Sequence, residues 1–178
     1  VLQSVKTKIN SLETSGGTNI EAGLMLARNN LDSKTVDGID YLYTILLTDG
    51  EPTMYVDGNR TSADKIDGNG LGYGATRESV KDIGTLANNI KEKGNGLSKL
   101  YSICCGEDVW NSKPFHSWSG VTPSVTEKTT IGEWLQAFST AAYKSDSADN
   151  LFDNFSSILE QIKIATKAFR VSDHMGEN

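Results

Sequence analysis

The stretch from residue 41 to residue 52 constrains the fold of this chain more than any other. Residues 41–48 are all aliphatic, aromatic or β-branched, and Asp49, Gly50 and Pro52 follow them closely. An apolar run that ends at turn-forming residues predicts a strand buried in a parallel sheet. Ligands of open α/β sheets bind outside the carboxyl ends of the strands. Asp49 is therefore a candidate ligand-binding residue.

Helical and extended patterns alternate along the rest of the chain. Apolar residues recur at helical spacing in residues 2–12, 20–31, 76–90 and 131–138, and again from Ser147 or Asp149 onward. Short strand patterns occupy residues 100–105 and 141–144. This alternation predicts an α/β fold, with a doubly wound, Rossmann-like and mostly parallel sheet flanked by helices.

The length of 178 residues fits one domain with its own core. We expect that domain to span residues 1–168, with polar, glycine-rich or proline-containing loop insertions at about 51–75 and 107–128. Apolar and polar residues alternate after residue 168. This alternation predicts that residues 169–178 form an exit strand leading toward a following domain.

The charge and the motifs exclude several classes of function. A formal net charge of -6 argues against nucleic acid and anionic membranes as partners. No apolar run is long enough to span a bilayer. The sequence contains no nucleophile–base or phosphate-loop motif, so we expect no enzymatic activity. The two cysteines, Cys104 and Cys105, are adjacent, which leaves buried free thiols or a strained vicinal disulfide open.

A second candidate ligand-binding residue precedes the helix predicted at 20–31. Thr18 follows two glycines there and stands just before Asn19. A hydroxyl at a helix entry and the Asp49 carboxylate at a strand end are plausible oxygen ligands for a hard divalent cation. Each residue also has a purely structural interpretation, because either Thr18 or Asn19 could cap the helix and Asp49 could cap a turn.

Gly-Gly-Thr-Asn before a helix, followed by a strand ending in Leu-Thr-Asp-Gly-Glu-Pro, resembles the von Willebrand factor type A (VWA) family. The resemblance covers most of the chain and implies a doubly wound sheet with a metal-ion-dependent adhesion site. Thr18 and Asp49 match two elements of that site. The third, Asp-x-Ser-x-Ser after the first strand, is absent, so the chain looks N-terminally incomplete. Two protein ligands would bind Mg²⁺, or Mn²⁺ or Ca²⁺, weakly or not at all.

The resemblance implies a metal-dependent adhesion module in a bacterial cell-surface or pilus protein. Such a module would be extracellular and anchored to the cell wall. It would bind a carboxylate of a host or matrix protein through the cation. The alternative is an intracellular VWA subunit that docks an ATPase or chelatase partner. A second chain or a swapped copy would complete the sheet, because the missing strand leaves one edge of the Asp49 strand unpaired.

Overall fold

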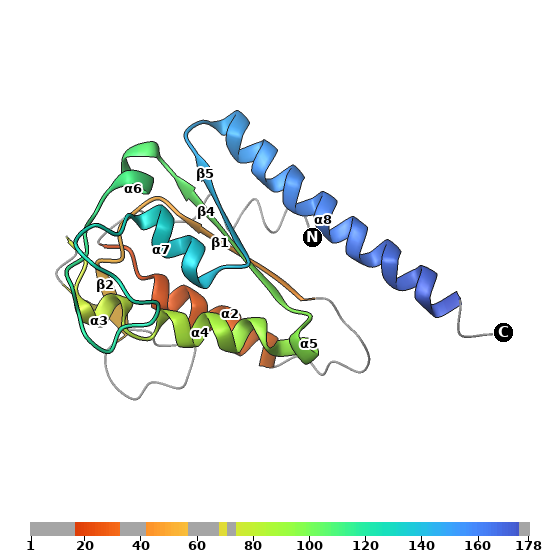
Figure 1. The fold of residues 1–178 in the computed structure, drawn as a ribbon, viewed down its shortest axis with the longest axis horizontal. Coiled ribbons are helices and arrows are strands. Elements are labelled where there is room, and N and C mark those ends of the chain that lie inside the picture. Colours follow the sequence, from red (N-terminus) through yellow and green to blue (C-terminus); the bar gives the residue numbers. More distant parts are fainter. Residues whose placement is uncertain (1–16, 33–41, 57–67, 71–73, 175–178) are drawn as a thin grey trace.

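The computed structural model of the chain describes residues 17–32, 42–56, 68–70 and 74–174. The helix predicted at residues 2–12 lies outside these residues. Three parallel strands form the main sheet: β1 (Tyr43–Thr48), β4 (Lys99–Cys105) and β5 (Ala141–Ser145). Their order is β1-β4-β5, so β4 is central (Figure 1). The strands predicted at 41–48, 100–105 and 141–144 are confirmed, each within about two residues.

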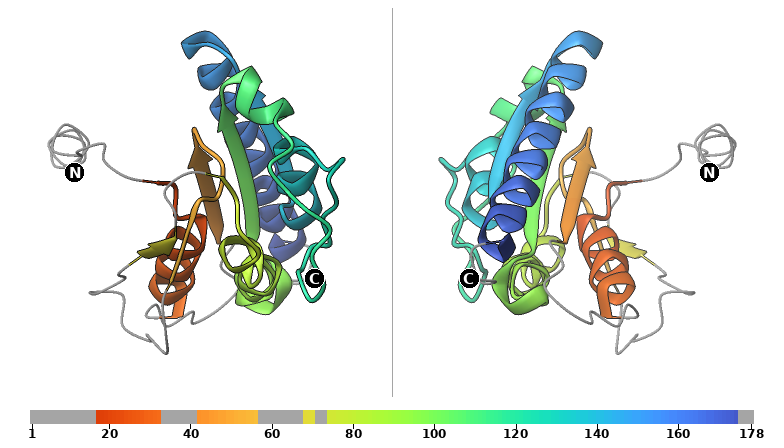
Figure 2. Two further views of the ribbon diagram at one scale, coloured as in Figure 1. Left: turned by 90° about the vertical axis from the view of Figure 1, so that its left-hand side faces the viewer. Right: turned by 90° about the vertical axis from the view of Figure 1, so that its right-hand side faces the viewer.

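Helices cover both faces of this sheet (Figures 1 and 2). Helices α2 (Ile20–Asp32), α4 (Ile83–Lys91) and α7 (Ile131–Phe138) lie on one face. The long helix α8 (Ala148–His174) lies on the other. The chain therefore has an α/β architecture with a small open parallel sheet flanked by helices. This arrangement is compatible with the predicted Rossmann-like fold, although the main sheet has only three strands among the described residues.

The helix predicted at 76–90 is broken into two pieces, α3 (Arg77–Val80) and α4, and a short helix α5 (Lys93–Gly96) follows. The break has a visible cause. The N–H of Gly84 donates to the carbonyl oxygen of Thr122 at 2.7 Å, which is not the partner one turn earlier that a continuous helix would require. The approach of the loop around Thr122 thus ends one helix and begins another.

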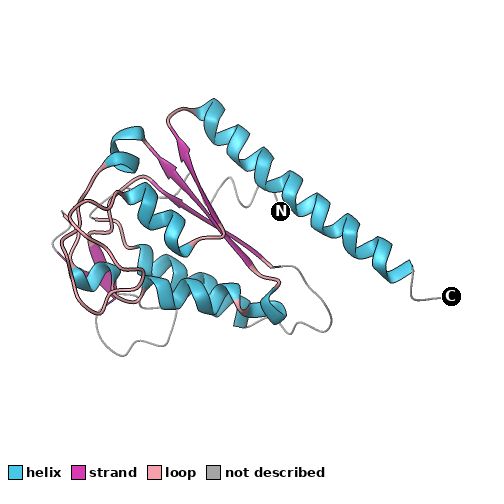
Figure 3. Cartoon of the chain, viewed as in Figure 1, coloured by secondary structure: helices cyan, strands magenta, loops and turns pink. Residues whose placement is uncertain are grey.

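The two predicted insertions contain short elements of their own (Figure 3). In the first, β2 (Met54–Val56) pairs antiparallel with β3 (Gly68–Gly70) in a separate two-stranded sheet. In the second, α6 (Glu107–Asn111) follows β4 directly. The rest of the second insertion is anchored to the core by three buried side chains, Phe115, Val121 and Val125, and Phe115 packs on Trp134 with 5.4 Å between the ring centroids.

The predicted exit strand at the end of the chain is wrong over its described part. Helix α8 begins after Ser147, whose hydroxyl accepts the N–H of Asn150, and continues to His174. No glycine or proline interrupts residues 148–174, so nothing in the sequence ends the helix at residue 168. The alternation after residue 168 was too short to outweigh a helix already formed. Residues 175–178 lie outside the described residues.

Candidate functional site

Thr18 is held against the segment that follows β1. Its carbonyl oxygen accepts the N–H groups of Thr53 and Met54, both at 3.1 Å. Its own N–H donates to the Thr53 hydroxyl at 2.9 Å, and a parallel bridge joins it to Pro52. These bonds fix the Thr18 backbone at the carboxyl end of β1.

The cap of α2 is Asn19 and not Thr18. The side-chain oxygen of Asn19 accepts the N–H of Ala22 at 2.9 Å, which is the usual N-cap bond. The Thr18 hydroxyl points instead at Gly50, where it occupies the space that a side chain at position 50 would need. Of the two residues expected to cap the helix, Asn19 does so and Thr18 does not, and the Thr18 hydroxyl oxygen lies beside the turn that contains Asp49.

Asp49 lies in that turn directly after β1, and its side chain is exposed. The buried hydroxyl of Thr48 organises the turn, because it donates to the carbonyl oxygen of Gly50 at 3.2 Å. The structure thus brings Thr18 and the Asp49 turn together at one edge of the sheet. Neither residue was close to the other in sequence, and the shared strand-end position predicted their approach.

Two thiols lie beside Asp49 at the same edge. Both cysteines are free, so the structure supports the interpretation as unpaired thiols. Burial, and to a smaller extent the charges of Cys105 and Asp49, raise the pKa of the Cys104 thiol to about 11. Burial and then the Asp49 carboxylate also raise the pKa of Cys105. The register of the sheet agrees with this effect, because Thr48 pairs with Cys104 and the residues that follow them are Asp49 and Cys105.

A hollow of about 280 Å³ opens at this edge, beyond the ends of β4 and β5. Its lining residues are Cys105, Gly106, Ser145, Asp146, Ser147, Ala148 and Leu151. Sequence reasoning did not include Cys105 and Ser145 among the candidate site residues. The sequence pattern could have indicated them, because each residue stands at the carboxyl end of a parallel strand. Such strand ends meet at one edge of the sheet.

Thr18 and Asp49, the two residues of the predicted metal site, both lie among the described residues. In the metal site predicted from the sequence, Thr18 and Asp49 would supply oxygen atoms of the kind that Mg²⁺ prefers. No three His, Cys, Asp or Glu side chains come together as metal ligands within residues 17–32, 42–56, 68–70 and 74–174. The chemistry of the two oxygens fits a hard cation, but two protein ligands leave most of the coordination shell to water or to a partner.

A buried carboxylate also lies near Thr18. Glu21, in the first turn of α2, accepts the N–H of Val56 at 2.8 Å and ties β2 to the helix. Burial raises the pKa of Glu21, and the hydrogen bond from Val56 offsets part of that effect. Because Glu21 is 9% exposed and already has a backbone partner, its role is structural.

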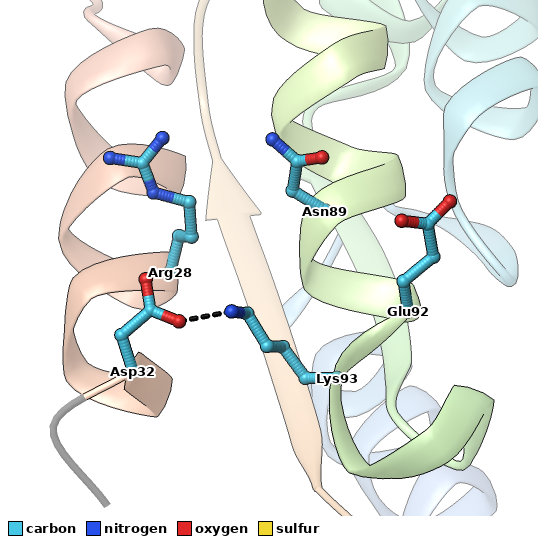
Figure 4. A pocket seen from close by; sticks show the side chains of 5 residues that line it. All are labelled: Arg28, Asp32, Asn89, Glu92 and Lys93. Carbon is cyan, nitrogen blue, oxygen red and sulfur yellow. Dashed lines mark ion pairs between the residues drawn. The ribbon is translucent and has the colours of Figure 1, made fainter.

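A second hollow, of about 340 Å³, lies near the C-terminal ends of α2 and α4 (Figure 4). Its lining residues are Arg28, Asp32, Asn89, Glu92 and Lys93. Lys93 and Asp32 form an ion pair, and Arg28 donates to the side chain of Asn29. Two positive and two negative side chains neutralise each other here. This hollow therefore lacks the net charge that would select an ionic ligand.

Comparison of the chain with protein-family models, with curated proteins and with solved structures finds no match. Within the described part of the chain, no helix has the length and apolar character needed to cross a membrane.

Proposed function

We propose that the chain is a VWA-type ligand-binding module in which Thr18 and Asp49 bind a divalent cation. Mg²⁺ is the cation best matched to a hydroxyl and a carboxylate oxygen, with Mn²⁺ or Ca²⁺ as substitutes. The observation that carries this proposal is the approach of the Thr18 hydroxyl to Gly50, the residue next to Asp49. A helix entry and a strand end that are distant in sequence meet there.

The bound cation would supply a positive charge with open coordination positions at the edge of the sheet. A carboxylate from a partner protein could then complete its shell, as the resemblance to the VWA family implies. The proposed partner is a host or matrix protein, and the proposed context is a bacterial cell-wall-anchored surface or pilus protein. The net charge of -6 supports a cation-mediated contact, because an acidic partner would otherwise be repelled.

Cys105 provides a sensitive test of the cation. Burial is the larger cause of the raised pKa of the Cys105 thiol, and a divalent ion on Asp49 would cancel the second cause, the negative charge of the carboxylate. The thiolate is the reactive form, so alkylation of Cys105 by iodoacetamide should become severalfold faster in millimolar Mg²⁺ at mildly alkaline pH. The measurement is the rate of Cys105 modification, followed by peptide mass spectrometry.

Two controls separate binding from simple screening. Potassium chloride at the same ionic strength should produce a smaller acceleration, because monovalent ions only screen the carboxylate. In Asp49→Asn the charge is already absent, so Mg²⁺ should add nothing beyond the potassium effect. Equal acceleration by the two salts in the unmodified chain would show that Asp49 binds no divalent cation, and the proposed function would fail.

A further inference from the structure

The polar groups that line the hollow beyond β4 and β5 are largely bonded within the chain. The Ser145 hydroxyl donates to the carbonyl oxygen of Ser147 at 3.1 Å. The N–H of Gly106 donates to the carbonyl oxygen of Ser145 at 2.7 Å. The Ser147 hydroxyl donates to the side-chain oxygen of Asn150 and accepts the N–H of the same residue. A polar ligand would gain little here, because each of these groups would first have to give up its present partner.

The charged side chain in the lining is also paired. The Asp146 carboxylate lies 3.8 Å from the ammonium group of Lys144. The other side chains of the lining belong to Cys105, Ala148 and Leu151. A free thiol behaves as a small apolar group with a weak S–H donor. The hollow is therefore suited to an uncharged, apolar group.

The hollow is large enough for a whole side chain. Figure 1 shows its place, where the carboxyl ends of β4 and β5 lie near the start of α8. Its volume of about 280 Å³ exceeds the roughly 150 Å³ that holds a benzene molecule in a protein interior. A leucine or phenylalanine side chain can therefore enter it.

The hollow also lies at a defined separation from the turn that contains Asp49. Thr48 pairs with Cys104, and Cys105 pairs with Ser145, so the ends of β1, β4 and β5 form a row. Neighbouring strands are about 4.8 Å apart, which places a point between the ends of β4 and β5 about 7 Å from the end of β1. Two residues of extended chain also span about 7 Å, and their side chains point the same way.

We propose that this hollow binds a leucine- or phenylalanine-sized side chain of the partner protein, two residues away from the acid that completes the shell of the cation. The inference rests on the proposed function, because a cation on Asp49 would fix where that acid lies. It adds a chemical class to the partner, namely an extended segment with an acidic residue and a large apolar residue at positions i and i+2, in either order.

Alkylation of Cys105 by iodoacetamide reports whether the hollow is filled, because Cys105 lines it. The probes are acetylated and amidated tripeptides at millimolar concentration with saturating Mg²⁺. Asp-Gly-Leu or Leu-Gly-Asp should slow the alkylation severalfold relative to Asp-Gly-Ser and Ser-Gly-Asp. The serine peptides are the reference, because they bring the same acid to the cation without a side chain that fills the hollow.

A larger side chain within the hollow should abolish this difference. Ala148 is an exposed residue at the start of α8, so Ala148→Leu can fill the hollow without entering the core. The leucine and serine peptides should then give nearly equal rates. Ala137→Leu is the matched control, at an exposed position of α7 on the other face of the sheet, and should keep the full difference.

The outcomes distinguish a failure of the hollow from a failure of the cation site. Equal rates with leucine and serine peptides in the unmodified chain, while Mg²⁺ still accelerates alkylation, would overturn the assignment of the hollow alone. An undiminished difference in Ala148→Leu would also overturn it. Equal slowing by Asn-Gly-Leu and Asp-Gly-Leu would overturn the link between the hollow and the cation. Absence of the Mg²⁺ acceleration itself would then identify the proposed function as the part that failed.

Discussion

The hydroxyl of Thr18 lies against Gly50, in the space that any side chain at position 50 would fill. Gly50→Ala should therefore force the Thr18 side chain to rotate away while the backbone bonds of Thr18 hold. We expect the variant to fold normally but to lose most of the Mg²⁺-dependent acceleration of Cys105 alkylation. Gly23→Ala is the matched control, because a methyl group there meets no atom within 4 Å. An unchanged Mg²⁺ response in Gly50→Ala would remove Thr18 from the proposed site.

The two thiols should differ strongly in reactivity. Cys104 is buried and has a pKa of about 11, whereas Cys105 is half-buried and lines an open hollow. Iodoacetamide should therefore modify Cys105 in the native protein before it modifies Cys104. Asp49→Asn should accelerate the Cys105 reaction severalfold without added metal, because the carboxylate no longer raises the pKa of the thiol. Peptide mass spectrometry resolves the two positions, and equal rates in both proteins would contradict the proximity of Asp49 to Cys105.

The buried Cys104 thiol makes stability depend on alkaline pH. Its pKa is raised from 9.0 in the ordinary thiol to about 11 in the folded protein, so folding favours the protonated form. The resulting stability is complete below pH 9 and is lost as the pH rises through about 11. The contribution is about 2–3 kcal/mol. Urea unfolding under reducing conditions should show this decline, and Cys104→Ala should show a smaller one.

Glu21 should give a pH effect in the acidic range. Burial raises its pKa, so the folded state binds the proton more tightly and loses stability as the pH rises through that folded pKa. Glu21→Gln keeps an oxygen for the N–H of Val56 without the buried charge. We expect it to be more stable than the unmodified chain at neutral pH, with the difference vanishing in acid. Glu21→Ala should be about 1–2 kcal/mol less stable than Glu21→Gln, because it leaves the Val56 N–H without its acceptor.

The strands and most helices could be predicted because their local sequence pattern and their burial in the folded protein favour the same conformation. The apolar run of β1 is an example, since burial and strand propensity favour the same conformation. The break between α3 and α4 could not be predicted, because it depends on the carbonyl of Thr122, far along the chain. The alternation after residue 168 favours a strand only in isolation, because the helix that begins at Ala148 continues through it to His174.

The candidate site was only partly within reach of the sequence. The two candidate oxygen donors, Thr18 and Asp49, could be named from their positions at a helix entry and a strand end. The sequence could not predict which of Thr18 and Asn19 caps the helix, because either side chain can do so. Only the structure distinguishes them, since Asn19 caps the helix and the Thr18 hydroxyl lies against Gly50. The proximity of Cys105 to Asp49 follows from the strand order, which places β4 beside β1.

Strand β1 is the outermost member of the described parallel sheet and carries no charged residue along its six positions. Natural proteins commonly protect such a border with lysine, proline or a bulge. Among the described strands only β4 pairs with it, and an uncharged border of this composition favours the addition of a further strand, which would extend the sheet.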